Sequence, residues 1–270
     1  MNQIHPTAII SNKAQLGSNN EIGPYCIIGD KVKMGDGNIL KSHVVLEGNS
    51  EIGSQNIFFP FSYVSDTPQD LKFIGEDAKI IIGNKNQIRE HATIHPGTKG
   101  GIMETRVGSN CLLMVNSHIA HDCVVGNNVI LANNATLAGH VEVDDFVIIG
   151  GLAAIHQFVR IGKYAMIGGM SGVKYDVIPF GVVSRDGDNL SGLNLIGMKR
   201  KGFLRQEIHD LRHFYKELFT KDGNKDFKNK AEQLSKKFPS QGVQEVANFI
   251  NAKASRELCF PVTISDEEVL

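Results

Sequence analysis

Aliphatic side chains recur at every sixth residue through the first two thirds of the chain. The run starts with Ile4, Ile10 and Leu16 and reaches Val173, with interruptions near residues 65–77 and 96–106. A small or compact residue usually lies four positions after each aliphatic residue, and a glycine often follows it directly. An amphipathic α-helix repeats every ~3.6 residues and a half-buried strand every two, so neither explains this period. A six-residue period is typical of a parallel β-helix, in which short strands alternate with corners.

Three hexapeptides make one coil of such a β-helix, so residues about 18 apart stack at the ~4.8 Å spacing of neighbouring strands. The spacing alone leaves the handedness of the coil open. The two interruptions, SDTPQDLKFIGED and PGTKGGIMETR, are too long and too polar to be corners. We expect them to form loops at about residues 65–77 and 96–106, which either carry function or are tolerated insertions.

The six-residue period fails after about residue 179, and helical spacing replaces it. Residues 204–219, LRQEIHDLRHFYKELF, place leucine, isoleucine and phenylalanine on one helical face. Further helices are expected over residues 226–238 and from Ser240, as an N-cap, to about Leu258. The sequence therefore predicts a mainly β protein with two domains, a hexapeptide-repeat parallel β-helix over residues 1–183 and a small α-helical domain over residues 184–270.

Charge and composition argue against several classes of protein. Lysine and arginine number 28 and aspartate and glutamate 29, so the net charge of -1 gives no overall attraction for nucleic acid or an anionic membrane surface. No segment offers about 18 uninterrupted apolar residues, and the N-terminus lacks the pattern of a signal peptide. The four cysteines form no CxxC pair. We expect a soluble, cytoplasmic protein with reduced thiols, no stable membrane insertion and no nucleic-acid partner.

Histidines gather on one edge of the expected prism. With a coil of about 18 residues, His121 stacks against Gly139, and Asp122 lies under His140. The residues brought to this edge by the repeat are His118, His121, Gly139, His140, His156 and Gln157. They do not occupy the inward positions of the repeat, so we expect them to face outward, towards solvent or another subunit.

Such a group suits proton abstraction. A neutral histidine can accept a hydroxyl proton near neutral pH, and a carboxylate beside it can fix its tautomer. Adjacent side chains diverge along a strand, so contact between His121 and Asp122 requires a corner. Two other interpretations stay open at this point, a zinc ion held by histidines between subunits and a polar stripe with only a structural role.

Several stretches resemble the UDP-N-acetylglucosamine O-acyltransferases, a hexapeptide-repeat family that begins lipid A synthesis in Gram-negative bacteria. The resemblance is carried by IGPYCIIG, LKSHVVLEG, QDLKFIGE, NSHIAHDC, ILANNATLAGHVEVDDFVIIGG, IHQFVRIG and GLNLIGMKRKGF. It implies a left-handed β-helix and a homotrimer with active sites in the clefts between adjacent prisms. It also implies transfer of an R-3-hydroxyacyl group from acyl carrier protein to the glucosamine 3-hydroxyl of UDP-N-acetylglucosamine. No metal or other cofactor is implied, because the acyl group arrives on the phosphopantetheine of acyl carrier protein.

The resemblance also implies roles for individual residues. His121 would be the general base, Asp122 its partner, and the Gly139 amide the donor to the oxyanion. From a neighbouring chain, the sugar and the acyl amide or hydroxyl region would be held by Gln69, Asp70 and Lys72. The nucleotide sugar or the pantetheine arm would be contacted by His118, His140, His156 and Gln157. The uridine and pyrophosphate would be reached by Asn194, Arg200 and Lys201. The end of the acyl-chain pocket would be formed by Gly169 and Met170.

One position departs from the family pattern. Some members carry an acidic residue that meets ribose where this chain has Ile196, so that ribose contact is not expected here. The remaining basic surface of the helical domain suits acyl carrier protein, which is small and acidic. Two alternative functions stay open. The first is a trimeric zinc enzyme of the carbonic anhydrase type, which would give the QDLK loop and the helical domain no function. The second is a non-catalytic scaffold, in which changing His121 would have no effect on function.

Overall fold

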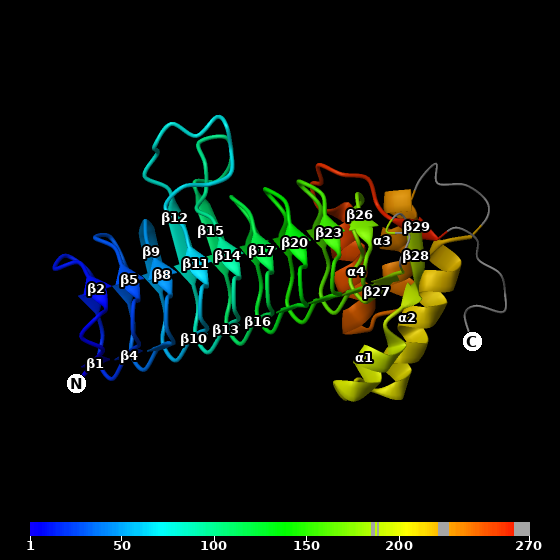
Figure 1. Ribbon diagram of the computed structural model, residues 1–270. Helices are drawn as coiled ribbons and strands as arrows, with labels where there is room; N and C mark the ends of the chain where they lie inside the picture. The colour runs from blue at the N-terminus through cyan, green and yellow to red at the C-terminus, as the bar shows by residue number, and fades with distance from the viewer. Residues whose placement is uncertain (185–186, 188, 221–226, 262–270) are drawn as a thin grey trace.

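The computed structural model describes residues 1–184, 187, 189–220 and 227–261. Over most of this length the chain coils as a left-handed parallel β-helix with three faces, and a cluster of helices follows at one end (Figure 1). Most strands have two residues and pair in parallel with the strands one coil away. The fold class expected from the six-residue repeat and from the family resemblance is confirmed.

The strands form three sheets, one on each face of the prism. Sheet A consists of β1 (Gln3–Ile4), β4 (Glu21–Ile22), β7 (Ile39–Leu40), β10 (Ile57–Phe58), β13 (Gln87–Ile88), β16 (Leu112–Leu113), β19 (Ile130–Leu131), β22 (Ile148–Ile149), β25 (Met166–Ile167), β27 (Gly181–Val183), β28 (Asn189–Leu193) and β29 (Phe260–Pro261). Sheet B consists of β2 (Ile9–Ile10), β5 (Ile27–Ile28), β8 (Val45–Leu46), β11 (Tyr63–Val64), β14 (Thr93–Ile94), β17 (His118–Ile119), β20 (Thr136–Leu137), β23 (Ala154–Ile155) and β26 (Gly172–Val173). Sheet C consists of β3 (Gln15–Leu16), β6 (Lys33–Met34), β9 (Asn49–Ile52), β12 (Lys79–Ile82), β15 (Glu104–Val107), β18 (Val124–Val125), β21 (Glu142–Val143) and β24 (Arg160–Ile161). We call the corners between these sheets the A–B, B–C and C–A edges.

The register of the coils follows the repeat except at the two loops. His118 pairs with Thr136, exactly three hexapeptides further along the chain. Across the first loop Tyr63 pairs with Thr93, and across the second Thr93 pairs with His118, so each loop makes its coil longer than three hexapeptides. The loops join β11 to β12 and β14 to β15, so both project from the B–C edge (Figure 1).

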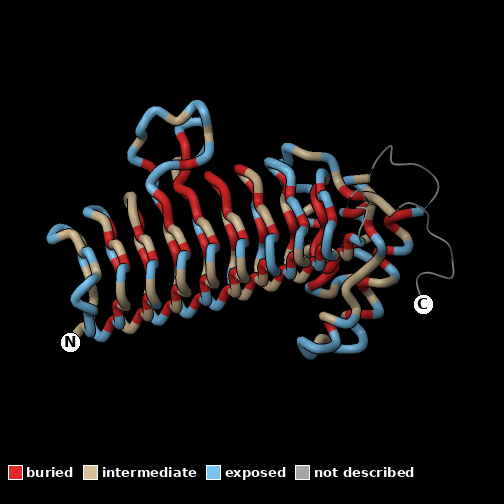
Figure 2. The backbone as a smooth tube through the Cα atoms, in the orientation of Figure 1, coloured by how far each residue is buried: buried red, intermediate tan, exposed pale blue. Residues whose placement is uncertain are grey.

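The core fills the inside of the prism. The inward aliphatic and compact residues are buried from Ile22 onward, and Cys26, Cys111 and Cys123 are among them, as expected (Figure 2). The first coil differs, because no coil covers its outer end. Ile4 lies at an inward position of the repeat and is still 49% exposed.

Four buried asparagines form a ladder inside the C–A edge that the sequence did not reveal. They occupy compact inward positions, and they are Asn20, Asn38, Asn56 and Asn86. The side-chain oxygen of each accepts from the backbone amide one coil further on, over 2.8–2.9 Å. The ladder ends at the amide of Cys111. Side chains thus add hydrogen bonds between successive coils at this edge.

The corners require an unusual backbone conformation. One residue at most corners has a φ near +60°, and Asn116, Asp122, His140 and Phe158 are non-glycine examples. For an L-residue this left-handed region costs roughly 1–2 kcal/mol relative to ordinary conformations. Asparagine and aspartate tolerate it better than most residues, which fits the number of asparagines at corners.

The helical part contains α1 (Leu195–Arg200), α2 (Arg205–Leu218), α3 (Phe227–Lys237) and α4 (Gln241–Asn251). The helices expected over 204–219 and 226–238 are confirmed by α2 and α3, apart from Asp226, which lies outside the described residues. The region expected to be a small α-helical domain also contains β28 and β29, which extend sheet A. None of the described helices is long and apolar enough to span a membrane.

The third expected helix is shorter than predicted. It ends at Asn251 instead of continuing to Leu258, because the chain becomes extended at Ala252. The segment after it returns to the prism, where the Cys259 amide donates to the Asp176 carbonyl over 2.8 Å. Ser240 occupies the N-cap position as expected, but its side chain makes no capping hydrogen bond.

Candidate active site

A corner of the B–C edge holds His121 and Asp122, between β17 and β18. Asp122 has a φ of +60°, and this turn brings the two adjacent side chains together. His121 Nδ1 lies 2.9 Å from Asp122 Oδ2. The contact that a straight strand would prevent is therefore made at the corner.

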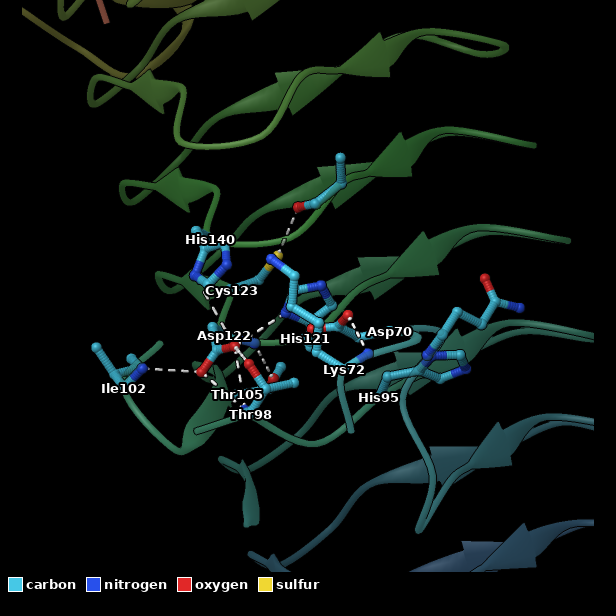
Figure 3. A network of polar contacts seen from close by, with 12 residues as sticks. Asp70, Lys72, His95, Thr98, Ile102, Thr105, His121, Asp122, Cys123 and His140 are labelled. Atoms are coloured by element: carbon cyan, nitrogen blue, oxygen red, sulfur yellow. Dashed lines mark hydrogen bonds and ion pairs between the residues drawn. The ribbon is translucent and has the colours of Figure 1, made fainter. Parts of the chain in front are cut away.

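The second loop holds the Asp122 carboxylate (Figure 3). The backbone amide and the hydroxyl of Thr98 donate to it over 3.1 and 2.7 Å, and the Ile102 amide donates over 2.9 Å. The Asp122 amide in turn donates to the hydroxyl of Thr105 over 2.8 Å. A Cβ added to Gly101 would lie 2.2 Å from the Asp122 carboxyl carbon, so only glycine fits this close approach.

These contacts keep Asp122 ionised. Burial by itself raises the pKa of its carboxyl, but hydrogen bonds from His121 and Thr98 and the charge of His140 outweigh burial and hold the pKa below its ordinary value. The second loop, expected to be either functional or a tolerated insertion, thus builds the environment of a buried charge. The sequence interpretation missed Thr98, Gly101 and Thr105, whose roles depend on how the loop folds back.

The next coil supplies Gly139 and His140. The imidazole of His121 lies directly on Gly139, since a Cβ added there would be 2.4 Å from Cε1 and 2.6 Å from Nε2 of the ring. His140 meets His121 edge to face, with ring centroids 4.9 Å apart, and stacks on Phe158 at 4.3 Å. The expected vertical neighbours, Gly139 over His121 and His140 over Asp122, are brought together.

Two further histidines lie beside this corner. His118 Nδ1 is 2.7 Å from the Thr93 hydroxyl, and its ring meets that of His95 edge to face at 4.9 Å. His95 Nδ1 accepts from the Gln69 amide over 3.2 Å, which ties the first loop to the end of β14. Burial, with the charges of His118 and His121, lowers the pKa of His95 to about 4, so the ring is neutral near neutral pH. His95 was missed because the second loop lengthens its coil, so that the regular spacing does not lead from His121 to it.

Burial of the pair corrects one expectation. His121 and Asp122 lie outside the interior of the prism, as expected, but they do not face solvent in this chain, because they are only 7% and 3% exposed. The physical reason is the second loop, which folds over the B–C edge and covers the carboxylate. A small remaining surface of His121 is what a substrate can reach.

The first loop lies beside the histidines of its own chain. Its Gln69 amide bonds to His95, and the charge of Asp70 acts on His140. The pKa of His140 is lowered, mainly by burial, against the opposing charges of Asp122 and Asp70. Within the loop, the Lys72 amide donates to the Asp70 carboxylate over 3.0 Å (Figure 3). The bond to His95 fixes the loop against its own chain. The expectation that Gln69, Asp70 and Lys72 serve a site shared with a neighbouring chain stays a prediction.

His156 and Gln157 lie further along the same edge, where both are exposed. Gln157 is the coil neighbour of Gly139, since β20 and β23 pair in register. Arg256, from the segment after α4, contacts both residues. Its Nε donates to the Gln157 carbonyl over 2.9 Å, and its Nη2 lies 2.7 Å from His156 Nδ1.

The other predicted contacts lie on different edges of the prism. Asn194 caps α1 through the Gly197 amide and donates to the Tyr164 carbonyl, on the C–A edge. Lys201 Nζ lies 4.6 Å from the ring centroid of Phe146 on that edge, and Arg200 precedes it as an exposed residue. Gly169 and Met170 form a corner of the A–B edge, between β25 and β26. One face of the prism, about 15–20 Å of strand and corner, separates neighbouring edges.

The cluster could in principle hold a cation, since ligand atoms of His121, Asp122 and His140 lie within 4.8 Å of one another. The Asp122 oxygens, however, already accept hydrogen bonds from Thr98, Ile102 and His121. A cation would have to break these bonds, so the donors fit a hydrogen-bonded imidazole better than a metal centre.

The buried cysteines of the prism are not activated nucleophiles. Burial raises the pKa of Cys123 to about 12 and that of Cys111 to about 11. Thiols with such pKa values stay protonated at neutral pH. Neither thiol is therefore a candidate nucleophile.

Sequence comparisons assign the chain to a family. A profile described as "Bacterial transferase hexapeptide (six repeats)" matches residues 13–48 and 104–139, and one described as "Udp N-acetylglucosamine O-acyltransferase; Domain 2" matches residues 176–259. An acyl-[acyl-carrier-protein]–UDP-N-acetylglucosamine O-acyltransferase of Rickettsia canadensis is 50% identical over 257 residues, which are 95% of this chain and 97% of that one. The chain belongs to the UDP-N-acetylglucosamine O-acyltransferase family.

Solved structures of this acyltransferase family share the fold. The UDP-N-acetylglucosamine acyltransferase of Campylobacter jejuni is 39% identical, with a TM-score of 0.89 over 97% of this chain and 100% of that one. The enzyme of the same name from Francisella novicida is 34% identical, with a TM-score of 0.92 over 97% of this chain and 95% of that one. The resemblance seen in the motifs thus extends over the whole architecture of the acyltransferase family.

Proposed function

We propose that this chain transfers an R-3-hydroxyacyl group from acyl carrier protein to the 3-hydroxyl of UDP-N-acetylglucosamine, as the first step of lipid A synthesis, with His121 as general base. The observation that carries the proposal is the 2.9 Å contact of His121 Nδ1 with the buried Asp122 carboxylate. The substrates are supported by membership of the acyltransferase family, whose members are named for acyl carrier protein and UDP-N-acetylglucosamine.

The contact with the Asp122 carboxylate selects one tautomer of His121. The carboxylate is ionised and can only accept, so Nδ1 carries the proton and donates it to Oδ2. The lone pair of His121 then lies on Nε2, the ring atom available to a substrate. A general base placed in this way contributes typically ~10²–10⁴ in rate.

The reaction then needs only proton transfer and charge stabilisation. His121 Nε2 takes the proton of the sugar 3-hydroxyl while that oxygen bonds to the thioester carbonyl carbon, which gives a tetrahedral oxyanion. The Gly139 amide, on the coil next to His121, donates to this oxyanion. The intermediate collapses as the carbon–sulfur bond breaks, and the pantetheine thiolate takes the proton from His121. A thioester is already activated, so the residues here can act without a covalent nucleophile.

The remaining contacts of the B–C edge would position the two substrates. Around His121 these are the predicted sugar and pantetheine contacts Gln69, Asp70, Lys72, His118, His140, His156 and Gln157. The bond from the Gln69 amide to His95 supports the loop members of this set, because it holds Asp70 within electrostatic range of His140. A neutral His95 is needed for that bond, since its Nδ1 must accept.

We further propose that the working molecule is a homotrimer. Asn194, Arg200 and Lys201 on the C–A edge cannot reach the His121 of their own chain across a face of the prism. If they bind the uridine and pyrophosphate of the same substrate, they must come from an adjacent copy. Closed rotational symmetry then gives each trimer three equivalent composite sites.

Exposed apolar side chains on the third edge support an acyl-chain pocket between copies. Leu152 and Met170 at corners of the A–B edge are 61% and 57% exposed, and Ile148 and Met166 on sheet A are 38% and 41% exposed. Such a contiguous apolar strip favours a partner surface or a lipid chain. Gly169 leaves space for a long chain, whereas the flexible Met170 could close the pocket.

Docking of acyl carrier protein is proposed for the basic helical surface. Besides Arg200 and Lys201, the first part of the helical region carries Lys199, Arg205, Arg212 and Lys216. Attraction between this surface and a small acidic carrier is expected to weaken with salt. Because acyl carrier protein is a cytoplasmic donor, we propose that the reaction takes place in the cytoplasm, without a resident cofactor.

The test is direct. Purified protein is incubated with UDP-N-acetylglucosamine and a mixture of R-3-hydroxyacyl carrier proteins of different lengths, and the product is weighed by mass spectrometry. We expect one acylated sugar nucleotide whose mass also gives the chain-length preference. His121→Ala should lower turnover by at least about 10²-fold. His5→Ala, an exposed histidine of the first coil, serves as the matched control and should be silent.

The alternatives give different results. A zinc enzyme of the carbonic anhydrase type would retain stoichiometric zinc after dialysis and lose activity to a chelator. A non-catalytic scaffold would give no acylated product, and His121→Ala would change nothing. Either result would overturn the proposed function.

The composite site has its own test. Mixing His121→Ala and Arg200→Ala chains in equal amounts gives three quarters heterotrimers, each with one intact site of three, so about a quarter of wild-type activity should return. Activity that stays at the level of the separate variants would show that His121 and Arg200 do not share a site between copies.

A further inference from the structure

The chain after α4 returns to the edge that carries the candidate active site. The Asp176 amide donates to the Glu257 carbonyl, and the Cys259 amide donates to the Asp176 carbonyl, both over 2.8 Å. Figure 1 shows this segment, in red, running along the same side of the prism as the two loops. Backbone pairing therefore fixes the residues that directly follow Arg256.

The anchor of this segment is itself rigid. Asp176 is fully buried, and its carboxylate accepts from the Arg160 amide over 2.8 Å and from Arg160 Nε over 2.7 Å. The guanidinium of Arg160 also lies 4.3 Å from the ring centroid of Phe249 on α4. The position of Arg256 is thus set by contacts between the last coils and the helices.

The contact with Arg256 determines which ring nitrogen of His156 carries the proton. A guanidinium carries only donors, and Nη2 of Arg256 lies 2.7 Å from Nδ1 of His156. The Gln157 carbonyl lies 3.4 Å from the same nitrogen, but it already accepts from Arg256 Nε. The shorter contact makes Nδ1 the acceptor, so the ring proton lies on Nε2. A second bond, from Arg256 Nε to the Gln157 carbonyl over 2.9 Å, fixes the plane of the guanidinium relative to the corner at residues 156–157.

We propose that Arg256 is a positioning residue that fixes the tautomer of His156 with the ring proton on Nε2. This rests on the proposed function, in which His156 contacts a substrate two coils from His121 on the same edge. In this form His156 donates one hydrogen bond and cannot accept one through Nε2. The site at this point therefore takes an acceptor oxygen of the sugar nucleotide or of the pantetheine arm.

The geometry separates the roles of the two histidines on this edge. Asp122 accepts from Nδ1 of His121 and leaves Nε2 as a base, whereas Arg256 donates to Nδ1 of His156 and leaves Nε2 as a donor. Opposite partners at the same ring atom thus give opposite functions to the same residue type. A carboxylate can only accept and a guanidinium can only donate, so each fixes the tautomer through the ring nitrogen that it contacts.

A double-mutant cycle tests whether Arg256 acts through His156. Arg256→Ala should lower kcat/KM by about tenfold in the wild-type background and by less than about twofold when His156 is already alanine. Lys253→Ala, an exposed residue of the same segment, is the matched control and should be silent in both backgrounds. Equal losses from Arg256→Ala in the two backgrounds would overturn the proposal, because the arginine would then act independently of His156.

The tautomer is measured separately, without turnover. In protein labelled with ¹⁵N-histidine, the ¹⁵N shifts of His156, assigned by comparison with His156→Ala, should show a proton on Nε2 alone. In Arg256→Ala the signal should shift towards a mixture of tautomers, and in Lys253→Ala it should not. An unchanged His156 signal in Arg256→Ala would refute the positioning role even if the acyl transfer itself proved correct. Absence of acyl transfer in the wild type would instead refute the proposed function and leave this result standing.

Discussion

Asp122→Asn replaces one oxygen of a buried carboxylate by an amide nitrogen and keeps the shape of the side chain. The carboxylate accepts from the Thr98 amide and hydroxyl, the Ile102 amide and His121 Nδ1. Asparagine offers one accepting oxygen, and the backbone amides of Thr98 and Ile102 can only donate. The asparagine oxygen must therefore face these amides, and its NH2 group must face the Thr98 hydroxyl and His121.

That orientation reverses the tautomer of His121. The NH2 group donates to Nδ1, so the proton of the ring moves to Nε2 and the basic lone pair is lost to the substrate. The loss of a correctly set general base is worth about 10²–10⁴ in kcat. Replacing charge-assisted bonds by weaker ones also costs about 1–3 kcal/mol of stability.

The assay measures acyl transfer at saturating concentrations of both substrates between pH 6 and 9. The melting temperature and the oligomeric mass of each variant are recorded alongside. Asp30→Asn, an exposed aspartate on the same edge, provides the matched control and should keep the wild-type rate. If Asp122→Asn keeps kcat within about threefold of wild type and remains folded, the carboxylate does not set the tautomer of His121.

Three further predictions follow from other contacts. Gly139→Ala places a Cβ 2.4 Å from the His121 ring and must displace the ring by about 1 Å, so kcat should fall about 10²-fold. Gly29→Ala, whose added Cβ would make only ordinary contacts, should leave kcat unchanged in the same assay. Asn38→Ala removes a side chain that accepts from the next coil and donates to two carbonyls, so thermal unfolding should show a loss of about 2–5 kcal/mol; a change below about 1 kcal/mol would contradict the ladder's role. The pKa of His95 falls from 6.5 in the unfolded chain to about 4 in the folded protein, so the unfolded chain binds more protons between these two pH values. The free energy of unfolding should therefore decrease as the pH falls through this window, by up to about 3 kcal/mol. His95→Gln should flatten this dependence of the melting temperature on pH, and an unchanged dependence would count against it.

The regular part of the fold could be predicted because a six-residue repeat leaves few arrangements. The vertical neighbours His121 and Gly139 followed directly from the coil length. His95 could have been found in the same way once the second loop was subtracted from the count, since Ile94 and Ile119 pair in register across that loop. The error came from applying the regular coil length where the chain inserts a loop.

Contacts made by irregular segments could not be predicted from the repeat. Thr98 binds Asp122 only because the second loop folds back over its own edge. The helix expected to continue to Leu258 has a suitable pattern, but the backbone of the Asp176 region offers hydrogen bonds that an extended chain can satisfy. Arg256 lies in that extended segment, so its contact with His156 depends on an ending that no local propensity specifies.

The positive φ of the corner residues has a wider consequence. Asp122, His140, Phe158 and Met170 all adopt it, and each projects from the prism at a point where the coil turns. The conformational penalty at such a point is similar for most side chains other than glycine, asparagine, aspartate and the β-branched residues. Replacing one corner side chain by another therefore changes the stability of the coil very little. The close-packed interior, in contrast, tolerates little variation. An ancestral prism of this kind could acquire or change a chemistry along one ridge without first solving a new folding problem.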